Sequence, residues 1–111
     1  MINRYLICVI INKGFSDLVM EAARKKGARG GTIINARGTG NKDIEKFYGI
    51  VIHPDKELVL IVIEEDKKAD VMEEIYKDCG LETRSQGIVF ALPVKDVKGL
   101  IEEEEEKDEK K

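Results

Sequence analysis

Residues 57–63 read ELVLIVI, and six of these seven side chains are apolar. A strand that is wet on one face alternates apolar and polar residues, whereas this run is apolar at successive positions. It is therefore typical of a β-strand that is covered on both faces. The stretches YLICVII at residues 5–11 and IVFAL at residues 88–92 have the same character.

Two amphipathic helices are expected between these strands. The first begins near Ser16 and ends at Gly27, and the second runs from about Lys67, with Asp66 as its cap, to Cys79. Their apolar stripes are Leu18, Val19, Ala22 and Ala23 in the first helix and Val71, Met72, Ile75 and Cys79 in the second.

Shorter elements complete the pattern. Residues 32–36 indicate a strand, and residues 47–52 a second short one. Residues 53–56, HPDK, predict a turn. Pro93 is expected to end the pairing of the last strand, and residues 95–101 to form one helical turn.

The resulting order, strand–helix–strand–hairpin–strand–helix–strand, predicts an α+β, ferredoxin-like split βαβ fold (βαββαβ). Both helices then lie on one face of an antiparallel sheet. The second face would leave a large apolar patch in water, which monomers avoid. We expect other copies of the chain to cover it. The alternative is that the loop 38–56 folds back over it, although that loop carries few large apolar side chains.

Charge separates the chain into a body and a tail. The 111 residues carry 19 Lys and Arg against 22 Asp and Glu, but residues 102–111 read EEEEEKDEKK with a net charge of −4. We expect a single domain over residues 1–101 and a disordered acidic tail over residues 102–111. The body has a net charge of +1 and no basic stripe, which argues against nucleic acid as a partner.

Residues suited to catalysis are scarce. His53 is the single histidine and can form neither a triad nor a multi-histidine metal site. Cys8 and Cys79 lie in apolar patterns and are expected to be core residues. Glu64 to Asp66 could hold a hard cation, but acids are also favoured at a helix start by its dipole. No apolar run is long enough for a membrane span or a signal peptide, so we expect a cytoplasmic protein. Because residues suited to catalysis are scarce, we also expect that it is not an enzyme and requires no metal.

Two glycine-containing turns are better candidates for binding. In GTGNK at residues 38–42, glycines let backbone N–H groups approach an anion, although a plain hairpin turn explains them as well. TRSQG at residues 83–87 is the second turn, and the fold brings the two together only through loops or neighbouring subunits. The candidate ligand-binding residues are Thr32, Arg37, Gly38, Thr39, Gly40, Asn41, Lys42, Arg84, Ser85, Gln86 and Gly87.

Two segments resemble the PII signal-transduction family. GARGGTIINARGTGNK at residues 27–42 is similar to the stretch that leads into the family's long T-loop, and GIVFALPVKDV at residues 87–97 to its GKIFVLPVED ending. The resemblance implies a homotrimer, adenine-nucleotide binding between subunits with Thr32 near the adenine, and nitrogen-related regulation of transporters or enzymes through the T-loop. Tyr48, in EKFYG, is similar to the family's modified tyrosine.

The same comparison shows departures at charged positions. Asn41 replaces an arginine, Lys42 replaces the glutamine that helps to sense 2-oxoglutarate, and Ile88 replaces a phosphate-binding lysine. The arginine pair of the family's C-loop is missing near residues 98–100. Charge-assisted hydrogen bonds to a third phosphate are therefore lost, which favours ADP, AMP or another adenine nucleotide over ATP.

Three functions are compatible with these features. The first is a PII-like regulator that binds a small effector between subunits and acts through loop 38–56 on an enzyme or on a transporter, such as one in the membrane. The second is a trimeric interaction module that has lost nucleotide and 2-oxoglutarate sensing. The third is a small enzyme or metal-binding protein on the same fold, because this fold hosts many functions.

Overall fold

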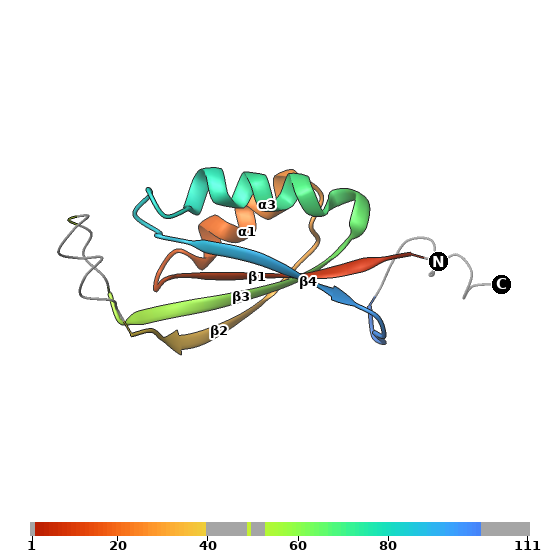
Figure 1. The fold of residues 1–111 in the computed structure, drawn as a ribbon, viewed down its shortest axis with the longest axis horizontal. Helices are drawn as coiled ribbons and strands as arrows, with labels where there is room; N and C mark the ends of the chain where they lie inside the picture. The colour runs from red at the N-terminus through yellow and green to blue at the C-terminus, as the bar shows by residue number, and fades with distance from the viewer. Residues whose placement is uncertain (1, 40–48, 50–52, 101–111) are drawn as a thin grey trace.

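The computed structural model describes residues 2–39, 49 and 53–100 (Figure 1). Within them the order βαββαβ is confirmed. The elements are β1 (Arg4–Asn12), α1 (Ser16–Lys25), β2 (Thr32–Arg37), β3 (Asp55–Glu64), α3 (Glu65–Cys79) and β4 (Ile88–Val94). The strand expected at residues 47–52 and the tail at residues 102–111 lie outside the described residues.

The four strands form one antiparallel sheet in the order β2-β3-β1-β4, and both helices pack on the same face of it (Figure 1). Ile7 of β1 pairs with Ile61 of β3 and with Ala91 of β4. This is the ferredoxin-like fold that the sequence predicts.

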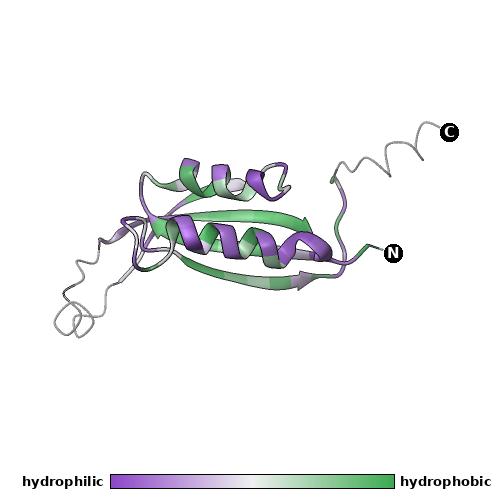
Figure 2. Ribbon diagram, turned by 90° about the horizontal axis from the view of Figure 1, so that it is seen from above, coloured by the Kyte–Doolittle hydropathy of each residue, from purple (hydrophilic) through white to green (hydrophobic). Residues whose placement is uncertain are grey.

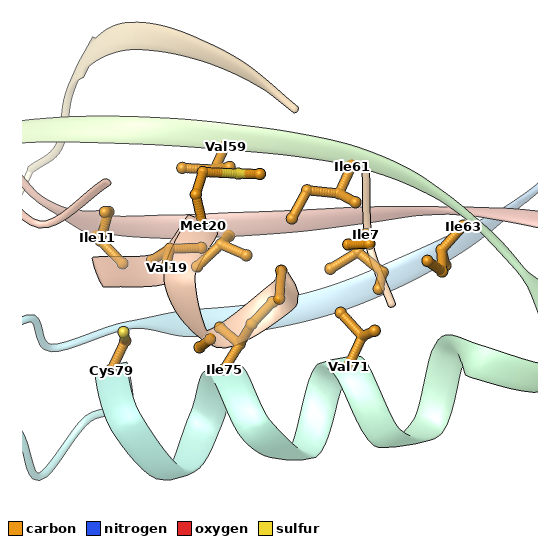
Figure 3. Packing of buried hydrophobic residues seen from close by; sticks show 14 residues of the cluster. Ile7, Ile11, Val19, Met20, Val59, Ile61, Ile63, Val71, Ile75 and Cys79 are labelled. Carbon is orange, nitrogen blue, oxygen red and sulfur yellow. The ribbon is translucent and has the colours of Figure 1, made fainter. Parts of the chain in front are cut away.

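The core lies between the sheet and the helices (Figure 3). Because side chains alternate along a strand, only every second residue of β1 and β3 points toward the helices. These strand residues meet apolar side chains of α1 and α3. Those at 0% exposure are Ile7, Val9, Ile11, Val19, Ala22, Ala23, Val59, Ile61, Val71, Ile75 and Cys79.

Each helix is amphipathic, and its hydrophilic residues face away from the sheet (Figure 2). The apolar stripe of α1 differs from the prediction, since Met20 is buried whereas Leu18 is 38% exposed. The predicted cap of α3 is also wrong. Glu64 is the N-cap residue, in extended conformation and without a side-chain cap hydrogen bond, and Asp66 lies inside the first turn.

Three boundaries differ from the prediction. Asp55 and Lys56 belong to β3 and not to a turn, because they pair with Arg37 and Ala36. Pro93 lies within β4, which tolerates it because β4 is an edge strand. Residues 95–100 form no helix.

The face of the sheet opposite the helices, called here the open face, is apolar across all four strands. The register aligns its side chains in three rungs across the sheet. From β2 to β4 these are Ile34–Leu58–Ile10–Ile88, then Thr32–Leu60–Cys8–Phe90, then Val62–Leu6–Leu92 across β3, β1 and β4. Ile34, Ile88, Phe90 and Leu92 are 40–56% exposed, so the expectation of strands that are apolar on both sides is confirmed.

Candidate functional site

The open face ends in polar residues where β1 and β2 finish and β3 and β4 begin; we call this the loop end. Lys56 of β3 pairs with Asn12 of β1 and follows the same alternation as Leu58 and Ile10, so both side chains lie on the open face. The Lys56 ammonium donates a 2.7 Å hydrogen bond from Nζ to Oδ1 of Asn12.

Asn12 joins the 83–87 turn to Lys56 at this end. Its Nδ2 donates to the Arg84 carbonyl at 3.0 Å and to Oε1 of Gln86 at 3.2 Å, and its backbone N–H donates to the Ser85 carbonyl at 2.9 Å. The side chain is only 5% exposed. Asn12 therefore holds the 83–87 turn against the strand that carries Lys56.

Lys56 is a half-buried cation whose hydrogen-bond partner among the described residues is a neutral amide. Burial lowers its pKa, because desolvation disfavours the charged ammonium. The aliphatic part of Lys56 packs beside Gly38, where a Cβ atom would lie 3.3 Å from it. An anion at this point would offset the desolvation of the ammonium.

Gly38 and Gly87, one from each turn, use their N–H groups within the chain. Gly38 donates to the Pro54 carbonyl at 2.8 Å, and Gly87 donates to the Cys79 carbonyl at 2.7 Å. A Cβ atom on Gly87 would collide with that same carbonyl, so glycine is required there for a close approach of two backbone segments.

The other predicted residues of the loop end differ in position. Arg37 pairs with Asp55 and lies on the helix side of β2, so it points away from Lys56, while Thr39 and Arg84 are exposed. Ser85 is 1% exposed and lies beside the Cys79 thiol, whose pKa is raised by burial and partly lowered by that hydroxyl. Gln86 has a left-handed backbone, with φ of 49°.

A cavity of about 610 Å³ opens at the opposite end of the sheet, and Thr32 lines it. Its walls are the segment before β2, the end of β3, the start of β1 and the described end of the chain. The lining residues are Arg4, Gly27, Arg29, Gly30, Gly31, Thr32, Leu60, Val62, Ile63, Glu64, Gly99 and Leu100. Leu60, Val62 and Thr32 also belong to the open face or its edge.

Charges surround this cavity. Arg4 stands opposite Glu64 in the sheet register, and the Glu64 carboxylate lies 3.7 Å from the Lys67 ammonium. The Lys67 chain in turn packs on Gly27. Arg4, Arg29 and the Glu64 carboxylate line the cavity, and Lys67 lies beside it.

Thr32 and Gly38 lie at opposite ends of β2. Lys56 pairs with Ala36, four residue steps from Thr32, so the two positions lie about 13 Å apart along the strands. The 83–87 turn lies across the sheet from Gly38, with β3 and β1 between them. The structure thus brings Gln86 and Lys56 together through Asn12, and it keeps Thr32 apart from both.

Sequence reasoning missed Asn12, Lys56, Arg4 and Arg29. Lys56 is in phase with Leu58 and Leu60, so extending the strand back by one residue pair would have placed it on the open face. Arg4 and Arg29 carried no motif. The predicted residues Gly40, Asn41, Lys42 and Tyr48 lie outside the described residues.

The histidine and both cysteines lie within the described residues. His53 is exposed, and Cys8 and Cys79 are free and buried, with burial raising the pKa of both thiols. Among residues 2–39, 49 and 53–100, no group of three or more His, Cys, Asp or Glu residues is placed to hold a metal ion. Over the same ranges, neither helix has the length and apolar character of a membrane span.

The element order and the antiparallel sheet with both helices on one face define a ferredoxin-like domain. The family model of the nitrogen regulatory protein P-II matches residues 4–104, and the chain belongs to this family. A sequence search of curated proteins finds no match.

Solved structures agree with this assignment. Arabidopsis thaliana PII bound to citrate is 26% identical, with a TM-score of 0.64 over 85% of this chain and 77% of that one. The B. subtilis GlnK–ATP complex is 15% identical, with a TM-score of 0.63 over 83% and 82%. A PII-like signalling protein from Thermus thermophilus is also 15% identical, with a TM-score of 0.63 over 84% and 87%. The last two likenesses concern the fold alone.

Proposed function

We propose that this PII-family protein is a regulator that binds a small anionic effector between subunits of a homotrimer. The observation that carries the proposal is the open face: an apolar surface across four strands, with Lys56 at the loop end and a cavity lined by Arg4 and Arg29 at the other. Water contact with such a surface is costly, at about 25 cal/mol for each Å² left uncovered. Copies of the same chain are the occupant that the family resemblance favours.

The effector site would join unlike ends of neighbouring chains. In one chain, Thr32 and Lys56 lie four residue steps apart along the sheet, so no single polar group of a ligand contacts both. If the cavity of one subunit faces the loop end of the next, the cavity receives an apolar or adenine-like group, and Lys56 and Arg84 receive the anion. Contacts between unlike surfaces close into rings, and a trimer is such a ring.

The effector class follows from the number of cations. Asn41, Ile88 and the residues near 98–100 lack the charges that the family resemblance implies for a third phosphate. We infer that ADP, AMP or another small adenine nucleotide binds at least as well as ATP, and that loop 38–56 conveys the bound state to a transporter or enzyme. Citrate in the plant structure shows that a polycarboxylate binds that PII protein, so it belongs among the ligands to test.

Calorimetry with ADP, AMP, ATP and citrate, together with light scattering, tests this proposal. We expect a particle of about three chain masses, an affinity for ADP no weaker than for ATP, and no gain from magnesium with 2-oxoglutarate. Tight magnesium-dependent ATP binding that 2-oxoglutarate enhances would contradict it. A trimer that binds none of these ligands would favour the interaction module that has lost effector sensing.

A further inference from the structure

The side-chain amide of Asn12 has one orientation that satisfies its neighbours. Its Nδ2 has two N–H donors, and both are used on oxygen atoms of the turn: the Arg84 carbonyl at 3.0 Å and Oε1 of Gln86 at 3.2 Å. Oδ1 then faces Lys56 and accepts the 2.7 Å hydrogen bond from Nζ. Turning the amide over would set its oxygen against two oxygens and its NH2 group against an ammonium. The 84–86 turn therefore fixes which atom of Asn12 meets the cation.

The contact with Asn12 holds Lys56 without neutralising it. An ammonium has three N–H donors, and the neutral amide occupies one of them. The two acids beside Lys56 in β3, Asp55 and Glu57, point to the helix side of the sheet by alternation, and Oε1 of Glu57 accepts the Gly14 N–H at 2.9 Å. Among the described residues, the structure gives Lys56 this neutral partner and no ion pair.

The surroundings of Lys56 make a charge without a counter-charge costly. Its aliphatic stem packs beside Gly38, and its neighbour in β2 is Ala36. Desolvation lowers the pKa of Lys56, which is the direction expected for a half-buried ammonium that lacks a counter-charge. An anionic group at this point would supply that counter-charge and accept the N–H donors that Asn12 does not use.

We propose that Asn12 is a positioning residue of the effector site: its neutral amide holds the Lys56 ammonium at the loop end and leaves the charge to pair with one anionic group of the effector. This role requires an amide. An aspartate would form the ion pair itself and would lack both donors to the 84–86 turn, whereas an alanine would leave the ammonium charged but unplaced. The pairing with an effector rests on the proposed function, and the state of Lys56 in the free protein does not.

Two substitutions separate this role from a purely structural one. Asn12→Asp keeps one of the three side-chain hydrogen bonds and Asn12→Ala keeps none, so the aspartate variant should be the more stable. For effector binding the order should be reversed, because only the aspartate neutralises Lys56. Asn35→Asp, exposed and on the helix side of β2, is the matched control for the added negative charge. Calorimetry of the full-length proteins with citrate and with ADP measures binding, and urea denaturation measures stability.

We expect Asn12→Asp to weaken the binding of citrate and of ADP by at least about tenfold, as for the loss of one hydrogen bond to a charged group. Asn12→Ala should weaken it less, and Asn35→Asp by less than about twofold. Affinities that follow the order of stability would overturn the proposal, since Asn12 would then act through the fold alone. Equal losses in Asn12→Asp and Asn35→Asp would also overturn it, because net charge would then explain both.

A titration of Lys56 tests the free protein without an effector. Followed by NMR at its ε-methylene carbon, Lys56 should have a higher pKa in Asn12→Asp than in the natural chain, because a carboxylate favours the ammonium form. An unchanged pKa would refute the role of the neutral amide. If citrate and ADP do not bind the natural chain, the proposed function fails for these ligands and the effector part of this inference fails with it, while the titration still decides whether Asn12 leaves the charge of Lys56 uncompensated.

Discussion

The Lys56 ammonium and the Asn12 amide meet at 2.7 Å on the open face of the sheet, and Asn12 in turn binds the backbone and side chain of the 84–86 turn. One buried amide thus connects the 84–86 turn to Lys56 at the start of β3.

Replacing Asn12 tests this connection. Asn12→Ala removes three side-chain hydrogen bonds and should lower the free energy of unfolding by about 2 kcal/mol, since each net contribution is about 1 kcal/mol or less in partly wet surroundings. Asn12→Asp keeps an acceptor for Lys56 but no donor for Arg84, so it should recover part of the loss. Urea denaturation measures both. An unchanged stability in Asn12→Ala would show that the network is not structural.

Lys56 should make stability depend on pH. Its pKa in the folded protein is below the unfolded value of 10.5, so the unfolded state holds more protons between those two values. Stability therefore rises with pH through that window, relative to Lys56→Met, because the cost of burying the charge disappears. Denaturation curves at a series of alkaline pH values measure the difference. Parallel pH profiles for the two proteins would contradict the prediction.

A charge on the open face should disrupt assembly. Phe90→Lys places an ammonium in the middle rung, next to Cys8, where 40% of the phenylalanine is exposed in the single chain. Light scattering should fall from about three times the 12.5 kDa chain mass toward one. Tyr76→Lys, at a 52% exposed position on α3, is the matched control and should leave the mass unchanged. Equal masses for both variants would argue against this face as the interface.

Two adjacent glycines of the cavity wall should respond differently to alanine. A Cβ atom on Gly31 would lie 2.9 Å from the Leu60 carbonyl oxygen and 3.0 Å from Sδ of Met20, whereas none lies within 4 Å at Gly30. Gly31→Ala should therefore cost about 1 to 3 kcal/mol of stability, and Gly30→Ala less than about 0.5 kcal/mol. Thermal melts of both variants measure the contrast. A larger loss of stability in Gly30→Ala than in Gly31→Ala would contradict this prediction.

The tail should not contribute to the fold. Consecutive glutamates repel one another and bury no apolar area. A chain that ends at Ile101 should keep its oligomeric state and melt within a few degrees of the full chain. Loss of the oligomer on truncation would show that residues 102–111 pack as part of the folded body.

The sequence by itself determined the order of the elements and the apolar character of both faces of the strands. ELVLIVI and the strands that pair with it are apolar at consecutive positions. Because successive side chains of a strand point to opposite faces of the sheet, such a run makes both faces apolar, and it can be recognised from the local sequence alone. It also indicated Thr32 and the 83–87 turn as candidates for binding. The sequence predicted the cap of α3 and the role of Pro93 wrongly. Pro93 lies within β4 because that strand pairs with β1, which is distant along the chain.

Only the tertiary structure decided which polar groups meet. The antiparallel register places Lys56 opposite Asn12, and the return of β4 brings the 84–86 turn to the same amide. It also uses the N–H groups of Gly38 and Gly87 within the chain, and it separates Thr32 from Lys56 by the length of β2. These relationships arise from pairing between residues more than 40 positions apart, as for Lys56 and Asn12, which no local sequence pattern encodes.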